Sequence, residues 1–143
     1  MAESICLHYT VPGDDFTRAG EASADLKQRL KKLGIPPGAV RKVSIALYEG
    51  EINLAIHAGG GEIEVAVTPQ RVDMVLSDQG PGIADIPLAM SEGYSTAPDE
   101  VRSLGFGAGM GLPNMKKYTD EFQIESALGE GTRIQMAVRL GPA

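Results

Sequence analysis

Apolar and polar positions along the first third of the chain follow two different periods. They alternate over residues 5–11, which predicts a strand. Three leucines then recur on one helical face, with lysine and arginine on the other, and predict a helix that begins at Asp14 or Asp15 and runs to about Leu33. Gly34 is the residue type that usually follows a helix in the left-handed conformation.

The rest of the chain groups its helices and strands instead of alternating them. We expect a second long helix, a strand hairpin, a short helix, a helix after a glycine run and a second strand pair, at 39–58, 62–68 with 72–77, 83–90, 112–118, and 122–127 with 133–140. About five strands and three to four helices in this order predict a two-layer α+β sandwich. They argue against a doubly wound dinucleotide fold.

Composition narrows the class of protein. A length of 143 residues fits one domain, 1–143, with its own core. The net charge of −6 argues against direct binding to nucleic acid, and no apolar run approaches the roughly 20 residues of a membrane span. The single cysteine, Cys6, excludes an intramolecular disulfide, and no signal peptide is apparent, so a cytoplasmic location is expected.

The second long helix carries a polar line on a largely apolar surface. Glu49, Asn53 and His57 stand four residues apart and therefore lie along one face. One interpretation is catalytic: Glu49 takes a proton from a nucleophile, and Asn53 offers an oxygen to Mg²⁺. The alternative is a solvent-facing stripe, since Glu51 is expected to be exposed. Gly50 costs about 1 kcal/mol relative to alanine inside a helix, which indicates a close approach at that point.

Two candidate ligand-binding residues lie in short loops next to predicted strands. Asp78 follows the first hairpin, with Gly80 and Gly82 behind it, and its carboxylate can accept a hydrogen bond from an exocyclic amine such as that of adenine. An ordinary turn explains the same residues. Thr132 follows the glycine turn 129–131, where it either contacts a ligand or simply suits a strand.

A glycine run leads into the helix expected at 112–118. Glycines 105, 107, 109 and 111 alternate with other residues, so backbone N–H groups and the helix start form a natural phosphate cradle. The alternative is a glycine hinge. No strand precedes the run and no Gly-Lys-Ser/Thr follows it, which excludes the Rossmann and Walker patterns.

Taken in order, these motifs resemble the GHKL ATPase superfamily, which includes gyrase B, Hsp90, histidine kinases and MutL. The matching boxes span about positions 40–140 and are Glu49-x-x-x-Asn53, Asp78-x-Gly80-x-Gly82, Gly107-x-Gly109-x-Gly111-Leu112 and Gly129-x-Gly131-Thr132. Within the superfamily the chain is most similar to the bacterial anti-sigma-factor and stress-switch serine/threonine kinases of the SpoIIAB, RsbW and RsbT kind.

The resemblance implies a Bergerat ATP-binding fold: a mixed, mostly antiparallel sheet of about five strands covered on one face by helices. It implies ATP and Mg²⁺ as cofactors, Glu49 as the general base and Asn53 as the Mg²⁺ ligand. It implies that Asp78, with Gly82 and Thr132, contacts adenine, and that Gly107, Gly109 and Gly111 contact the phosphates. Gly80 and Leu112 belong to the same nucleotide-binding boxes. Arg102 matches a lid arginine that lies near the phosphates or near a bound partner.

The function implied is a Mg-ATP-dependent protein kinase in bacterial partner switching, which phosphorylates a serine or threonine of a STAS-domain antagonist. A sigma factor or a phosphatase is a further candidate partner, and a homodimer is left open. The alternative is an ATP-binding anti-sigma factor or regulatory module that transfers nothing. Glu49 favours the kinase, because a pure binding protein has no need of a buried base.

Overall fold

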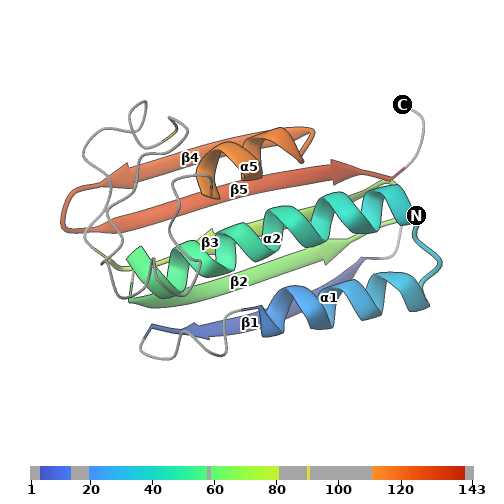
Figure 1. Ribbon diagram of the computed structural model, residues 1–143, viewed down its shortest axis with the longest axis horizontal. Helices are drawn as coiled ribbons and strands as arrows, with labels where there is room; N and C mark the ends of the chain where they lie inside the picture. The colour runs from blue at the N-terminus through green and yellow to red at the C-terminus, as the bar shows by residue number, and fades with distance from the viewer. Residues whose placement is uncertain (1–3, 14–19, 58, 81–89, 91–110, 141–143) are drawn as a thin grey trace.

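Five strands pair into one antiparallel sheet in the order β1-β2-β3-β5-β4 (Figure 1). The computed structural model describes residues 4–13, 20–57, 59–80, 90 and 111–140. The strands are β1 Ile5–Pro12, β2 Gly60–Val67, β3 Arg71–Ser77, β4 Glu121–Ala127 and β5 Gly131–Arg139. All four strand pairings are antiparallel. The helix expected at 83–90 falls almost entirely outside the described residues.

Three helices cover one face of this sheet, with α2 between α1 and α5 (Figure 1). Their bounds are α1 Glu21–Lys32, α2 Pro37–His57 and α5 Gly111–Lys117. The predicted two-layer α+β architecture, with about five mostly antiparallel strands, is therefore confirmed. No helix of the described residues is both long and apolar enough to cross a membrane.

The core lies between the helices and one face of the sheet. Strands β2 and β3 place every second side chain against the helices, as in the alternating burial of Ile63, Val65 and Val67. Helix α2 buries apolar residues over most of its length, including Leu47 and Leu54. This packing fixes α2 along the middle of the sheet, so that its C-terminal half approaches the end of β3.

Helix α1 begins at Glu21, so the prediction of a start at Asp14 or Asp15 is wrong. Gly20 precedes the helix with φ of 107° and offers no side-chain cap. Residues 14–19 lie outside the described part of the chain. The first turn is capped from another helix instead, by a carboxylate that the local sequence does not contain.

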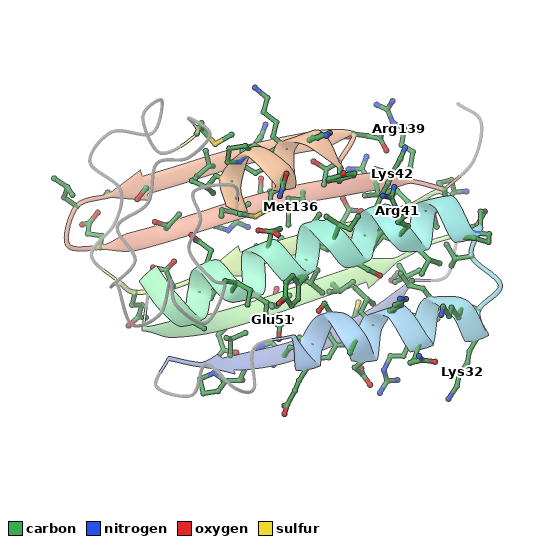
Figure 2. All side chains as sticks on the ribbon, viewed as in Figure 1. Lys32, Arg41, Lys42, Glu51, Met136 and Arg139 are labelled. Carbon is green, nitrogen blue, oxygen red and sulfur yellow. The ribbon has the colours of Figure 1, made fainter. Side chains whose placement is uncertain are left out.

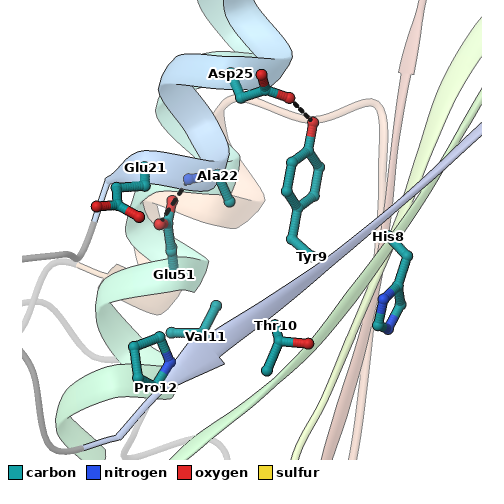
Figure 3. A pocket seen from close by; sticks show the side chains of 9 residues that line it. All are labelled: His8, Tyr9, Thr10, Val11, Pro12, Glu21, Ala22, Asp25 and Glu51. Carbon is teal, nitrogen blue, oxygen red and sulfur yellow. Dashed lines mark hydrogen bonds between the residues drawn. The ribbon is translucent and has the colours of Figure 1, made fainter.

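That carboxylate belongs to Glu51 of α2, and its predicted exposure is wrong. Only 2% of Glu51 is exposed. Its Oε2 accepts hydrogen bonds from the N–H groups of Gly20 (2.8 Å) and Ala22 (3.0 Å), and its Oε1 accepts one from the N–H of Ser23 (3.0 Å). Figure 3 shows the bond from Ala22. Three otherwise unsatisfied donors at the start of α1 are thereby paired, and α1 is attached to α2.

Gly50 lies where α2 crosses β3 and α5, as its position inside a helix indicated. A Cβ added there would stand 2.3 Å from Leu76 Cδ2 and 3.3 Å from Met115 Sδ. Both of those side chains are almost fully buried. The glycine therefore allows the close approach of three elements.

Gly50→Ala should lower the free energy of unfolding by about 1 kcal/mol, measured by chemical denaturation. The added methyl group overpacks the contact with Leu76 and Met115 at a cost of about 1–3 kcal/mol. The higher helix propensity of alanine offsets about 1 kcal/mol of this cost. Gly38→Ala in the same helix is the control, because nothing lies within 4 Å of the added Cβ. That variant should be as stable as the wild type or slightly more stable. Equal effects of the two substitutions would contradict the packing argument.

Candidate functional site

The loop after β3 is fastened to the start of β5 through Asp78. The Asp78 N–H donates to the Thr132 carbonyl at 3.0 Å, and the Thr132 N–H donates to Asp78 Oδ1 at 3.2 Å. The Gly80 N–H also donates to Oδ1, at 2.8 Å. No described residue donates to Asp78 Oδ2, so this oxygen is left as an acceptor while Oδ1 fixes the direction of the carboxylate.

Two glycines allow neighbouring backbones to approach this loop. Gly131 has φ of 111°, and a Cβ there would stand 2.2 Å from the Asp78 carbonyl oxygen. A Cβ on Gly61 would stand 2.5 Å from the Ser77 carbonyl oxygen and 2.8 Å from Leu54 Cδ2. Any larger residue at either position would push the loop away, so β5, β2 and α2 all converge on Asp78.

Thr132 is nearly buried, with 8% of its surface exposed. Its hydroxyl oxygen lies 2.8 Å from Ser126 Oγ, across the β4–β5 pair. Sequence reasoning did not select Ser126, because a serine in a strand carries no distinctive signal. In the structure it holds the Thr132 hydroxyl beside the Asp78 loop.

Glu49 and Asn53 lie one turn apart on the C-terminal half of α2, and both are partly buried. Burial raises the pKa of Glu49, because an apolar surrounding disfavours the charged form. A hydrogen bond from the Asn114 side chain has the smaller, opposite effect on that pKa. Asn114 stands in the first turn of α5, and sequence reasoning did not select it.

The remaining predicted residues divide into two groups. Gly111 is the first residue of α5, and Leu112 is 7% exposed and packs in the hydrophobic core. Gly82, Arg102, Gly107, Gly109 and the His57 side chain lie outside the described residues. Within the described part of the chain, no three His, Cys, Asp or Glu side chains gather to hold a metal ion.

A separate open pocket of about 350 Å³ lies between β1 and α1 (Figure 3). Tyr9 and Asp25 face each other across it, with the tyrosine hydroxyl donating to Asp25 Oδ2 at 2.7 Å. Glu51 also lines it, but that carboxylate already accepts three N–H groups. Asp78, Thr132 and Asn53 do not line this pocket, which therefore belongs to the packing of α1 and not to the candidate site.

Comparisons with a family model and with known proteins point to the same family. A family model described as "Histidine kinase-, DNA gyrase B-, and HSP90-like ATPase" matches residues 39–142. The chain is 36% identical over 109 residues to the serine/threonine-protein kinase RsbT of Bacillus subtilis (strain 168), covering 73% of this chain and 76% of that protein. It is 34% identical over 103 residues to an anti-sigma F factor of Clostridium botulinum (strain Eklund 17B / Type B), covering 68% of each.

Solved structures show the same fold. A Mycobacterium tuberculosis protein with RsbU and RsbW domains matches 95% of this chain with a TM-score of 0.64 and 18% identity; the match spans only 32% of that longer chain. The mycobacterial sensor histidine kinase MprB matches over the full length of both chains, with a TM-score of 0.54 and 18% identity. On the strength of the family match and the relatives, this chain belongs to the GHKL family of histidine kinase-, DNA gyrase B- and HSP90-like ATPases.

Proposed function

We propose that the chain is a cytoplasmic, Mg-ATP-dependent serine/threonine protein kinase of bacterial partner switching, acting on a STAS-domain antagonist. The observation that carries the proposal is Glu49, a partly buried carboxylate whose pKa is raised, one helical turn from Asn53. The RsbT relative, named a serine/threonine-protein kinase, supports the same activity.

Glu49 has the properties that a general base requires. Burial makes the carboxylate more basic than an exposed one, and none of the described residues forms an ion pair with it. We assign it to accept the proton of the serine or threonine hydroxyl whose oxygen attacks the phosphorus of the donor. Bound Mg-ATP supplies the phosphoryl group and the screening of its charge.

The Asp78 loop suits the recognition of a base with an exocyclic amine. Asp78 Oδ1 is engaged by two N–H groups, which leaves Oδ2 as the acceptor for the ligand. Asn53 offers an amide oxygen, and Mg²⁺ commonly takes only one or two protein ligands beside phosphates and water. We therefore assign adenine to Asp78 and Thr132, and the cation to Asn53. Phosphate contacts at Gly107, Gly109 and Gly111 remain part of the proposal.

A rival function is a module that binds ATP and a sigma factor without transfer. The relatives named anti-sigma F factor favour the sigma factor as its partner. The deciding experiment incubates the purified chain with radiolabelled ATP, Mg²⁺ and the proteins that co-purify with it from its source. Label on a serine or threonine of a co-purifying protein, identified by mass spectrometry, supports the kinase. Tight ATP binding with no labelled protein would overturn the kinase and leave the binding module.

Asn114→Ala should move the acidic limb of the rate–pH profile for transfer to higher pH. The Asn114 hydrogen bond lowers the pKa of Glu49, so its loss raises that pKa further and reduces the fraction of carboxylate in acidic solution. The rate above the new pKa should change little. Asn114→Asp should move the limb in the same direction, because a second negative charge disfavours ionisation. If the acidic limb does not move in either variant, Asn114 has no effect on the pKa of Glu49.

A further inference from the structure

Exposed cations gather at the end of the helical layer that is remote from Asp78. Helix α1 ends there and α2 begins there, and α5 runs toward that end (Figure 1). Figure 2 shows Lys32, Arg41 and Lys42 at this end of the molecule. We use the term basic end for six exposed cations on the three helices: Lys31, Lys32, Arg41, Lys42, Lys116 and Lys117.

The cations of the basic end make no direct ion pair within the described part of the chain. None of the six cations forms an ion pair with a described carboxylate. Their neighbours are paired: Arg29 with Asp25 at 2.7 Å, and Arg71 with both Asp73 and Glu121. A local excess of positive charge therefore stands on a chain whose net charge is −6.

Helix stability explains only part of this arrangement. Lysines in the last turns of α1 and α5 are favoured by the helix dipole. Arg41 and Lys42 occupy the second turn of α2, where the dipole gives no such stabilisation, and the first turn of α2 contains no acidic residue. With these two cations the basic end carries six positive charges, and the helix dipole accounts for only four of them.

Apolar side chains accompany the cations. Leu33, which directly follows Lys32, is 47% exposed. The Tyr118 ring is partly exposed and lies beneath two cations, with its centroid 5.8 Å from Arg41 Cζ and 5.4 Å from Lys117 Nζ. Tyrosine and arginine are enriched at protein interfaces, whereas a phosphate backbone is held mainly by charge, so the Tyr118–Arg41 pair favours a protein partner.

Lys42 also stands on the same side of α2 as the proposed base. Seven residues, or close to two helical turns, separate Lys42 from Glu49, which corresponds to about 10 Å along the helix axis. A protein domain that places a hydroxyl group at Glu49 is wide enough to reach Lys42 as well. The basic end and Glu49 can therefore contact one partner at the same time.

We propose that the basic end docks an acidic surface of the protein partner whose serine or threonine reaches Glu49. The inference rests on the proposed function and adds to it the chemistry of the partner: acidic side chains about 10 Å from the acceptor hydroxyl. The acidic remainder of this chain repels the same surface, so the charge distribution also orients the approach of the partner.

The test measures binding of a fluorescent glutamate-rich peptide at low ionic strength and without nucleotide, so that it does not depend on catalysis. Lys42→Glu and Lys116→Glu should each raise the Kd about fivefold. Arg133→Glu on the other face of the sheet is the control, since it is exposed and changes the net charge by the same amount. It should leave the Kd within about twofold of the wild-type value. Thermal unfolding of each variant verifies the fold.

Equal loss of peptide binding in all three variants would overturn the docking surface, because net charge alone would then explain it. Tighter binding to a DNA duplex or to phosphatidylserine vesicles, lost in the same two lysine variants, would overturn the protein partner. Peptide binding that depends on the two lysines, in a protein that transfers no phosphate, would support the docking surface and contradict the kinase. The docking surface and the kinase activity can therefore be contradicted independently of each other.

Discussion

Glu51→Ala should lower the free energy of unfolding by about 3–5 kcal/mol. The substitution leaves three N–H groups at the start of α1 without their acceptor, and two of these hydrogen bonds are buried. Each unsatisfied buried donor costs about 1–3 kcal/mol, and the loss of packing between α1 and α2 adds to that. The sequence offers no replacement cap, since Gly20 has no side chain.

Chemical denaturation followed by circular dichroism measures this effect. Glu51→Gln should give an intermediate loss, because its amide oxygen can still accept from part of the N–H set. Glu64→Ala is the matched control, since Glu64 lies exposed on β2 and should change stability by no more than about 0.5 kcal/mol. A Glu51→Ala variant as stable as the Glu64→Ala variant would show that the start of α1 does not depend on the carboxylate.

The helices and strands could be predicted because their apolar residues repeat with a clear period. The strand at 5–11, both strand pairs and the end of the helix near Leu33 all lie within two residues of their predicted positions. The start of α1 could not be predicted in this way. A helix start is usually read from a local capping side chain, whereas here the cap comes from a residue 28 to 31 positions later in the chain.

Glu49 and Glu51 illustrate why burial is harder to predict than helix formation. The two glutamates are two residues apart on one helix, so they point to different sides of it. The sequence indicated Glu49 as the residue needing a partner and Glu51 as solvent-exposed. Only the packing of α1 against α2 shows that Glu51 is the more deeply buried of the two, and that its role is structural.

The residues of the candidate site were each proposed separately from the sequence, which did not predict how they are arranged in space. Asp78 and Thr132 are 54 positions apart and each had an ordinary alternative explanation. They meet because β3 pairs with β5 and not with its sequence neighbour β4. Ser126 and Asn114 were not found, because each becomes informative only when the residue it contacts is known.

Glu49→Gln should reduce the rate of phosphate transfer by about 10²- to 10⁴-fold, the range usual for loss of a general base. Glutamine has the size of glutamate and can still accept a hydrogen bond from Asn114, but it cannot take the proton of the attacking hydroxyl. ATP affinity should stay within about threefold, because the assigned adenine contacts lie on the loop after β3 and on β5, and not on this side chain.

Single-turnover transfer to the labelled partner and equilibrium binding of a fluorescent ATP analogue measure the two quantities separately. Glu64→Gln makes the same chemical change at an exposed position and should transfer at the wild-type rate. Transfer by Glu49→Gln at the wild-type rate would remove Glu49 from the mechanism. Loss of ATP binding together with transfer would instead make Glu49 part of the nucleotide site. If transfer is lost while ATP binding is kept, the raised pKa of Glu49 serves catalysis. A glutamate with a purely structural role would instead change stability or binding first.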